Sequence, residues 1–342
     1  MKKKTRNITS TDIAKIAGVS RTTVSFVLNN KVDQNISEET KNKVLKVVQK
    51  LGYQPDRKAI DLAKTSRYKI GLLVDISESF HYSDVFLSRL FNAMLKKTKR
   101  KQDRLLYIPF NFKTRPIEKA LVLNLDAAII INPKENDRII QKLKEIELPF
   151  VVLGLVSDKE IPTINVDDFQ AAKIATEHLI EAGFEDIAMI AHAPRKYIGS
   201  KQRVNGYLAA LLEHELPIRN EWIIEAKFNV ESGYLAAKEL WKLKKKPEAI
   251  FAGNDEIAVG AMHFLHENNV VIPDDVSLVG FDDDPLSEYL FPALTTIAVS
   301  SVDMGNQCMS QIYSLLKGKK DFKKKITLPT HLVIRETVKR KK

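Results

Sequence analysis

Apolar positions near the start of the chain follow a helical period that stops at one glycine. The residues that mark a buried helix face over positions 11–17 are Ile13, Ala14, Ile16 and Ala17. Gly18 then supplies a sharp turn that other residues resist, and Val19 is the apolar plug of that turn. Ser20 stands where the N-cap of a second helix belongs.

The second helix begins at Arg21 and has two different faces. Its apolar positions are Val24, Val27 and Leu28, and its other face carries Arg21, Thr22, Ser25 and Phe26. A short polar helix set after a tight turn indicates a helix-turn-helix that presents its second helix to a charged surface. The alternative is an ordinary helical hairpin packed in a core.

A third helix follows and ends at a clear signal. Ser37 is its N-cap, acidic residues occupy its first turn, and Gly52 follows its last residue, Leu51. Residues 56–64 predict one more helix of about two turns, which is marginal alone in water. We therefore expect this short helix to depend on a partner, either protein or nucleic acid.

From Tyr68 the pattern changes to apolar strands that alternate with helices. Strands are expected at 70–74, 104–108, 127–131, 150–153, 187–190, 222–226, 249–252 and 276–281. Helices are expected at 85–98, 117–123, 137–146, 169–182, 204–214, 232–243 and 257–268. Such a series predicts parallel sheets covered on both faces, too many units for one sheet and therefore two α/β lobes. Ligands of such sheets bind beyond the carboxyl ends of the strands, here in a cleft between the lobes.

Positive charge is concentrated in the first fifth of the chain. The whole sequence carries a net charge of +11, and residues 1–64 hold fourteen Lys and Arg against six Asp and Glu. A basic head on a nearly neutral body indicates a polyanionic partner for the head, the alternative being a solvated charged face.

Other features restrict the class of protein. Cys308 is the single cysteine, which excludes a disulfide framework and a thiolate metal cluster within the chain. No apolar segment resembles a signal peptide or reaches the length of a membrane span, so we expect a cytoplasmic protein. These features and the basic head also disfavour a transport-binding protein.

Signatures of enzyme chemistry are absent from the sequence. It contains no GxGxxG, Walker A, HExxH or GxSxG motif, and the paired carboxylates at 282–284 lack a positioned acid elsewhere. His263 and His266 lie three residues apart without an evident third metal ligand. We therefore expect no enzyme, no cofactor and no metal.

Motifs over nearly the whole chain resemble the lactose-repressor/galactose-repressor family of bacterial regulators. They are Ile13-Ala14-x-x-Ala17-Gly18-Val19-Ser20, Thr23-Val24-Ser25, Val27-Leu28-Asn29, Ser37-Glu38-x-Thr40, Leu51-Gly52-Tyr53-x-Pro55, Ala59-x-x-Leu62, Gly253-Asn254-Asp255, Gly280-Phe281-Asp282-Asp283, Leu294-Thr295-Thr296 and Arg335-Glu336. The resemblance implies an all-α helix-turn-helix head over 1–55, a hinge over 56–67 and a two-lobed body over 68–342 that is similar to periplasmic sugar-binding proteins. Its first lobe is expected at 68–165 and 295–325, and its second at 166–294 and 326–342.

The resemblance also implies a function. Members are usually repressors, so we expect a regulator of carbohydrate-metabolism genes that binds a pseudo-palindromic operator as a dimer. A sugar or sugar phosphate in the cleft is expected to modulate this binding. A corepressor-dependent or global catabolite-type regulator remains the alternative. No leucine heptad follows Val338, so we expect a dimer rather than a tetramer.

DNA contacts are carried over from the family position by position. The matching residues are Thr9, Ser20, Arg21, Thr22, Thr23, Ser25, Phe26, Asn29, Tyr53, Arg57, Ala59 and Leu62. Arg21 and Thr22 match the positions that contact base edges, and Leu62 matches a leucine that inserts into the minor groove. Phe26 departs from a common base-reading arginine, so we expect a changed operator preference at that step.

Effector contacts are carried over with two doubts. The matching residues are Phe80, Arg203, Phe228, Asp255 and Asp282. Phe80 lies in a segment without the family's usual proline, and Phe228 aligns less securely than the others. Asp255 has helix capping as its alternative role, and Asp282 has a solvated turn. Arg195 and Lys196 leave a phosphorylated ligand open, with a solvated loop as the alternative.

Overall fold

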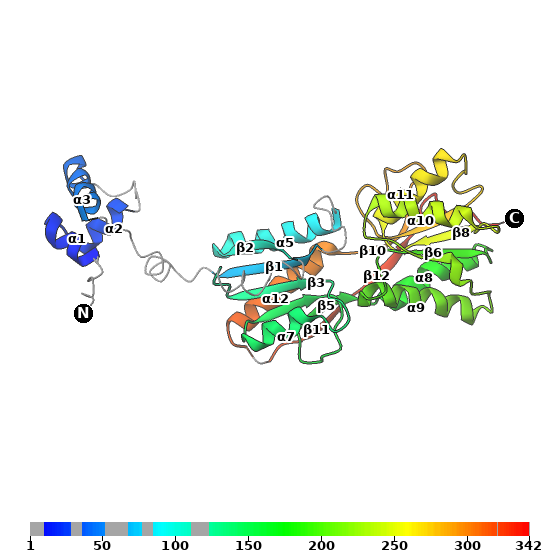
Figure 1. Cartoon of the computed structure of the whole chain (residues 1–342), viewed down its shortest axis with the longest axis horizontal. Coiled ribbons are helices and arrows are strands. Elements are labelled where there is room, and N and C mark those ends of the chain that lie inside the picture. Colours follow the sequence, from blue (N-terminus) through cyan, green and yellow to red (C-terminus); the bar gives the residue numbers. More distant parts are fainter. Residues whose placement is uncertain are drawn as a thin grey trace, which may run out of the picture. The chain divides into compact units, whose positions relative to one another are not determined.

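The computed structural model describes residues 10–28, 36–51, 68–76, 85–110, 123–319 and 321–341. The chain divides into two compact units, Met1–Arg67 and Tyr68–Lys342, each of which is described by itself. We call them the head and the body. In Figure 1 the described part of the head is helical, and the body consists of sheets covered by helices. No helix among the described residues is both long enough and apolar enough to cross a membrane.

The head contains helices α1 (Ser10–Ala17), α2 (Arg21–Leu28) and α3 (Glu38–Leu51). Its small core is made of Ile13, Ala14, Ala17, Val24 and Val44. Gly18 has a φ of +64°, a left-handed conformation that suits glycine and turns the chain between α1 and α2.

The prediction that Ile16 is buried is wrong, because its side chain is 59% exposed. Ile13, Ala14 and Ala17 are all buried, and the centre of this group lies about 100° around the helix from Ile16. Ile16 therefore sits at the edge of the apolar face and points outward.

One sheet of the body has the strand order β11-β5-β4-β3-β1-β2, and all its pairs are parallel. The strands are β1 (Lys69–Asp75), β2 (Arg104–Phe110), β3 (Ala127–Ile131), β4 (Phe150–Leu153), β5 (Thr163–Val166) and β11 (Lys325–Leu328). Helices α5 (Val85–Lys101) and α12 (Ser301–Leu316) pack on one face, and α7 (Arg138–Glu145) packs on the other. These elements form the first lobe.

The second sheet has the order β12-β10-β9-β8-β6-β7. Its strands are β6 (Ile187–Ala191), β7 (Ile223–Glu225), β8 (Ala249–Ala252), β9 (Ser277–Asp282), β10 (Thr295–Val299) and β12 (Thr330–Val333). Helices α8 (Asp168–Glu181) and α9 (Ile198–Glu213) cover one face, and α10 (Val230–Lys242) and α11 (Asp255–Glu267) cover the other. A 3-10 turn, η1 (Asn220–Trp222), precedes β7. These elements form the second lobe.

The predicted fold class is confirmed: a helical head is followed in the chain by two α/β lobes with mainly parallel sheets. Two details differ from the prediction. β10 pairs with β9 and β12, so residues 295–299 belong to the second lobe and not to the first. β12 is antiparallel to β10, whereas we expected parallel strands. Short or polar segments hid β5, β10, β11 and β12 from a search for apolar runs, and α12 was not among the expected helices. The helix expected at 117–123 lies almost wholly outside the described residues.

Candidate functional site

The N-terminus of α2 is the first candidate site. The Ser20 hydroxyl accepts a hydrogen bond from the Thr23 backbone N–H at 3.0 Å, the geometry of a helix N-cap. Arg21 and Thr22, in the first turn of α2, are exposed. The structure thus presents two adjacent side chains that carry hydrogen-bond donors at the start of one helix.

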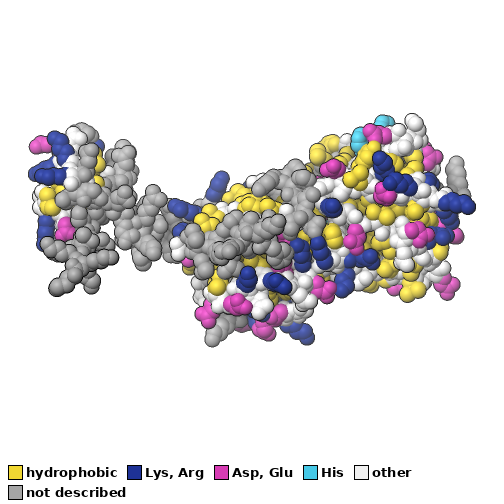
Figure 2. Space-filling model, in the orientation of Figure 1, with side chains coloured by type: hydrophobic (Ala, Val, Ile, Leu, Met, Phe, Trp, Pro, Cys, Tyr) yellow, Lys and Arg dark blue, Asp and Glu magenta, His cyan; other side chains and the backbone are white. Residues whose placement is uncertain are grey.

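Basic side chains are accessible on all three described helices of the head. Among the described head residues the exposed or half-buried bases are Lys15, Arg21, Lys41, Lys43, Lys46 and Lys50. Figure 2 shows dark blue Lys and Arg side chains on the surface of the head. Exposed cations on a small domain provide the sequence-independent attraction that a nucleic acid needs.

Some expected DNA contacts cannot be placed. Phe26 is half-buried in α2. The residues Thr9, Asn29, Tyr53, Arg57, Ala59 and Leu62, and the Ser25 side chain, lie outside what the structure describes. Their roles stay predictions.

A cavity between the two lobes of the body is the second candidate site, and we call it the cleft. The centre of a water molecule can reach about 90 Å³ of it. Phe86, Asn132 and Asn165 line it from the first lobe, while Arg203 and Asp282 line it from the second. Several lining residues directly follow parallel strands, which is where α/β folds bind ligands.

Arg203 is held in the cleft by three contacts. Its Nε donates to Asp168 Oδ1 at 2.7 Å, and its Nη1 donates to the Gly253 carbonyl oxygen. The guanidinium also lies over the Phe281 ring, 3.5 Å from its centroid. A side chain fixed in this way loses little further freedom when it binds a ligand.

Phe228 stands in a group of three rings on the second-lobe side of the cleft. His192 and Tyr197 contact it edge-on, with ring centroids 5.4 and 5.2 Å away. Its φ of +63° is uncommon for an aromatic residue and places the ring between its neighbours. Asp282 also has a positive φ, +118°, at the end of β9, and strained backbone of this kind often occurs at binding sites.

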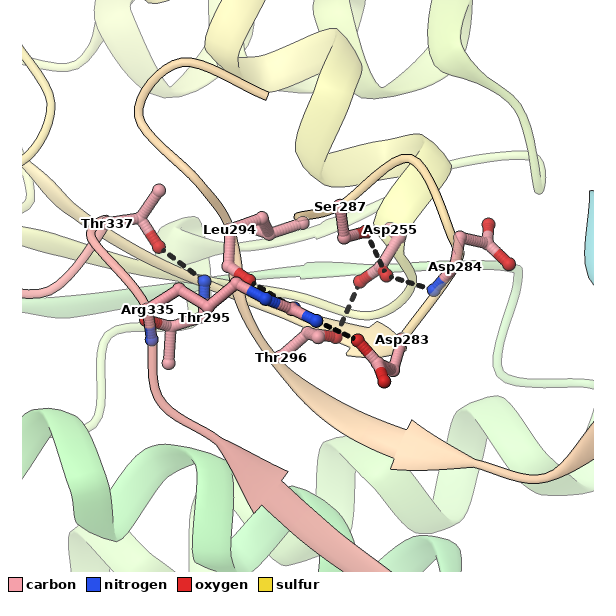
Figure 3. Close-up of polar contacts among 9 residues, drawn as sticks. All are labelled: Asp255, Asp283, Asp284, Ser287, Leu294, Thr295, Thr296, Arg335 and Thr337. Atoms are coloured by element: carbon pink, nitrogen blue, oxygen red, sulfur yellow. Dashed lines mark hydrogen bonds and ion pairs between the residues drawn. The ribbon is translucent and has the colours of Figure 1, made fainter. Parts of the chain in front are cut away.

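The Asp255 carboxylate lies in a buried network of hydrogen bonds. Asp255 is 2% exposed, and it lines a second cavity, beside Asn229, Asp284 and Ser287, rather than the cleft. Its carboxylate accepts hydrogen bonds from the hydroxyls of Ser287 and Thr296, both at 2.6 Å, and from the Asp284 backbone N–H at 2.9 Å. Figure 3 shows these donors converging on Asp255. These contacts give Asp255 a structural role, and effector binding by Asp255 stays a prediction.

The network around Asp255 also accounts for other motif residues. Arg335 donates to Asp283 at 2.6 Å and to the Leu294 carbonyl oxygen, and Thr337 accepts from the Thr295 backbone N–H (Figure 3). These contacts join β9, β10 and the end of the chain. Burial raises the pKa of Asp255 to about 6, although its hydrogen bonds oppose this change.

Sequence reasoning missed most lining residues of the cleft, including three polar ones close to Arg203 or Asp255. These three are Asp168, His192 and Asn254, the last of which is the N-cap of α11. Asn254 directly precedes the residue that we had selected. Phe80 lies outside the described residues. No group of three metal-ligating side chains occurs within the described ranges, and His263 lies near Glu267 instead.

Known proteins match both units of the chain. Residues 9–56 match the model of bacterial regulatory proteins of the lacI family, and residues 176–338 match that of a periplasmic binding protein-like domain. The probable HTH-type transcriptional repressor ExuR of Bacillus subtilis is 31% identical, over 97% of this chain and 99% of its own length. Catabolite control protein A of Priestia megaterium is 29% identical, over 97% of this chain and all of its own length.

Solved structures agree with this assignment. The lac repressor dimer bound to operator and the anti-inducer ONPF superposes with a TM-score of 0.75 at 25% identity, covering 98% of this chain and all of that one. The predicted family is therefore confirmed. The chain belongs to the lacI family of bacterial regulatory proteins and is a DNA-binding transcriptional regulator rather than an enzyme.

Proposed function

We propose that this chain is a cytoplasmic repressor of carbohydrate-metabolism genes whose operator affinity is changed by a polyhydroxylated effector in the cleft. The observation that carries the proposal is the pairing of two sites in one chain. Exposed Arg21 and Thr22 begin a capped helix on a basic head, and the body encloses a polar, aromatic-lined cavity.

Helix α2 supplies the sequence-specific part of DNA binding. The Arg21 guanidinium suits the O6 and N7 acceptors of guanine, and Thr22 suits a neighbouring base edge or methyl group. Ser20 and Thr23 are engaged with each other at the cap and are better suited to phosphate. The lysines of the head add salt-dependent attraction to the backbone.

The cleft supplies what a polyhydroxylated ligand needs. Arg203 and Asn254 offer donors, Asp282 offers acceptors, and these groups bind hydroxyls in pairs. The rings of Phe228 and Phe86 line the same cavity and provide apolar surface for the face of a sugar ring.

An exposed apolar segment of the second lobe suits a dimer contact. Leu286 is 62% exposed, Tyr289 77% and Phe291 96%, an unusual density for a surface turn. A dimer places two recognition helices on the half-sites of a pseudo-palindrome. We assign this segment as part of the interface between copies.

Coupling between the sites uses the connections between the lobes. The chain passes from one lobe to the other after β5, after β10 and after β11. A ligand that prefers one arrangement of the lobes shifts the population toward it, and operator affinity follows. Induction and corepression differ only in which arrangement binds DNA.

The test has two steps. Sites are first selected from random DNA with the full chain, and we expect a pseudo-palindrome that is bound by a dimer. Operator affinity is then titrated with neutral sugars and sugar phosphates, and the sign of the change distinguishes inducer from corepressor. Selection of no consensus, or an operator affinity that no compound of either kind changes, would contradict the proposal.

A further inference from the structure

Three described residues that line the cleft carry formal charges, and two of them are negative. They are Asp168, Arg203 and Asp282. Arg203 and Asp168 have side chains only 11% and 9% exposed and form an ion pair at 2.7 Å. Arg203 is thus neutralised by the protein, and Asp282 places a second carboxyl group in the cavity lining.

Three other basic residues, close in sequence to residues that line the cleft, contact other groups of the protein. Lys134 pairs with Asp75 at 2.6 Å, and Arg195 pairs with Glu225 at 2.7 Å. The ammonium group of Lys196 lies 5.9 Å from the centroid of the Tyr197 ring. None of these three bases is among the described residues that line the cavity. The phosphate-binding role that Arg195 and Lys196 left open has no support in this geometry.

His192 adds a polar group without adding charge. The residue is 6% exposed, lines the cleft, and its Nδ1 has no hydrogen-bond partner among the described residues. Burial and the nearby Arg203 hold the pKa of His192 well below its usual value, so the ring is neutral near pH 7. A neutral imidazole next to Phe228 suits a hydroxyl group.

We infer that the cleft selects an uncharged sugar over acidic or phosphorylated counterparts, and that Asp168 sets this preference by neutralising Arg203. The inference rests on the proposed function and narrows its effector class. Asp168 acts here as a positioning residue, because its effect on the ligand is exerted through Arg203, which it orients and neutralises.

The physical reason is the cost of burying charge. An anion that leaves water for this cavity gains only an arginine already shared with Asp168 and meets the like charge of Asp282. Hydroxyl groups incur no such cost, and they find acceptors at Asp282 and polar groups at His192 and Asn254.

The test compares matched ligands on the full-length protein. The probes are neutral aldohexoses, the uronic acid of each, and the 6-phosphate of each, measured by calorimetry at pH 7. For the hexose series that binds, we expect the neutral member to bind at least about tenfold more tightly than either anion.

Asp168→Asn removes the neutralising charge and keeps the size of the side chain. We expect the ratio of neutral to anionic affinity to fall by about tenfold, and Asp168→Glu to retain part of the preference. The matched control is Asp167→Asn, one residue earlier. Asp167 is the N-cap of α8, a role that Asn also fills, and is not among the lining residues of the cleft.

A merely structural role for Asp168 would lower both affinities equally and leave their ratio unchanged, which would overturn its assignment. Tighter binding of uronates or phosphates by the unaltered protein would overturn the inference and leave the proposed function standing. Binding of no neutral or anionic sugar would contradict the proposed effector class itself.

Discussion

The basic side chains of the two sites lie in opposite environments, exposed in the head and buried and paired in the cleft. In the head, Arg21 and most of the described lysines are exposed to solvent. In the cleft, Arg203 is almost buried and is paired with Asp168. An exposed cation suits a polyanion whose counterions it releases, whereas a neutralised one suits hydrogen bonding to an uncharged ligand.

The sites also differ in how closely they depend on the fold. Arg21 and Thr22 project from one short helix, so their replacement leaves the core of the head intact. Residues of the cleft come from strand ends far apart in sequence and are mostly buried. Changes in the head should therefore separate DNA binding from stability, and changes in the second lobe should couple function to stability.

The largest effect is expected for Asp255→Ala. It leaves the buried donors of Ser287, Thr296 and Asp284 without their acceptor, so the free energy of unfolding should fall by about 3 kcal/mol or more. Urea denaturation measures this. Asp274→Ala, which removes an exposed carboxylate, is the control and should change little. Equal losses in both variants would mean that the network contributes no special stability.

The pH dependence of stability should identify the same carboxylate. The pKa of Asp255 is raised from 3.8 to about 6 in the fold, so folding favours its protonated form. Protonation of Asp255 therefore adds to the stability of the fold; this added stability is complete below about pH 4 and is lost as pH rises through about 6, a change of about 3 kcal/mol. Asp255→Asn lacks this dependence. The difference in unfolding free energy between the unaltered protein and Asp255→Asn should therefore change between about pH 4 and pH 6. A difference that stays constant over this range would contradict the raised pKa of Asp255.

Arg21→Ala should reduce operator affinity without changing stability. The loss of a bidentate contact to guanine costs about 1–3 kcal/mol, which is about a fivefold to 150-fold loss, and relaxes specificity at one base pair. Fluorescence anisotropy on the selected operator and on its single-base variants measures both effects. Lys46→Ala, an exposed change on α3, should weaken all sequences slightly and equally. A uniform loss for Arg21→Ala would show that this residue contacts only phosphate.

Ser20→Ala should destabilise the head by about 1 kcal/mol, because the N–H of Thr23 loses its capping acceptor. Thermal unfolding of the head, followed by far-ultraviolet circular dichroism at a wavelength sensitive to helix, measures the loss. Ser20→Asp retains a capping oxygen and should unfold near the original temperature. A larger loss for Ser20→Asp than for Ser20→Ala would argue against capping.

Phe26→Arg should produce the smallest change in total affinity and a change in base preference. Selection of sites from random DNA with both proteins compares the preferred base at the affected step. Identical consensus sequences would make Phe26 a packing residue of α2.

Local signals explain why the head was predicted well from sequence. Gly18, Ser20 and Ser37 act on the residues next to them, and the observed bounds of α1, α2 and α3 differ from expectation by at most one residue. Buried strands such as β3 were equally clear, because their runs are wholly apolar.

The cleft was harder to predict because its residues are far apart in sequence and come together only in the folded protein. Asn254 is the N-cap of α11 and has an extended backbone, whereas Asp255 is the first helical residue, so their side chains leave the chain in different directions. One therefore reaches the cleft while the other faces β10. Asp168 and His192 carry no motif of their own, and only their proximity to Arg203 indicates a role.

The most direct test measures operator affinity of the full chain with and without a saturating sugar, alongside Arg203→Ala. The account predicts that the sugar changes operator affinity of the unaltered protein at least about fivefold, in one direction. Arg203→Ala should bind operator as the sugar-free protein does and show no response to the sugar. An equal response in Arg203→Ala would contradict the claim that the cleft controls the DNA-binding head.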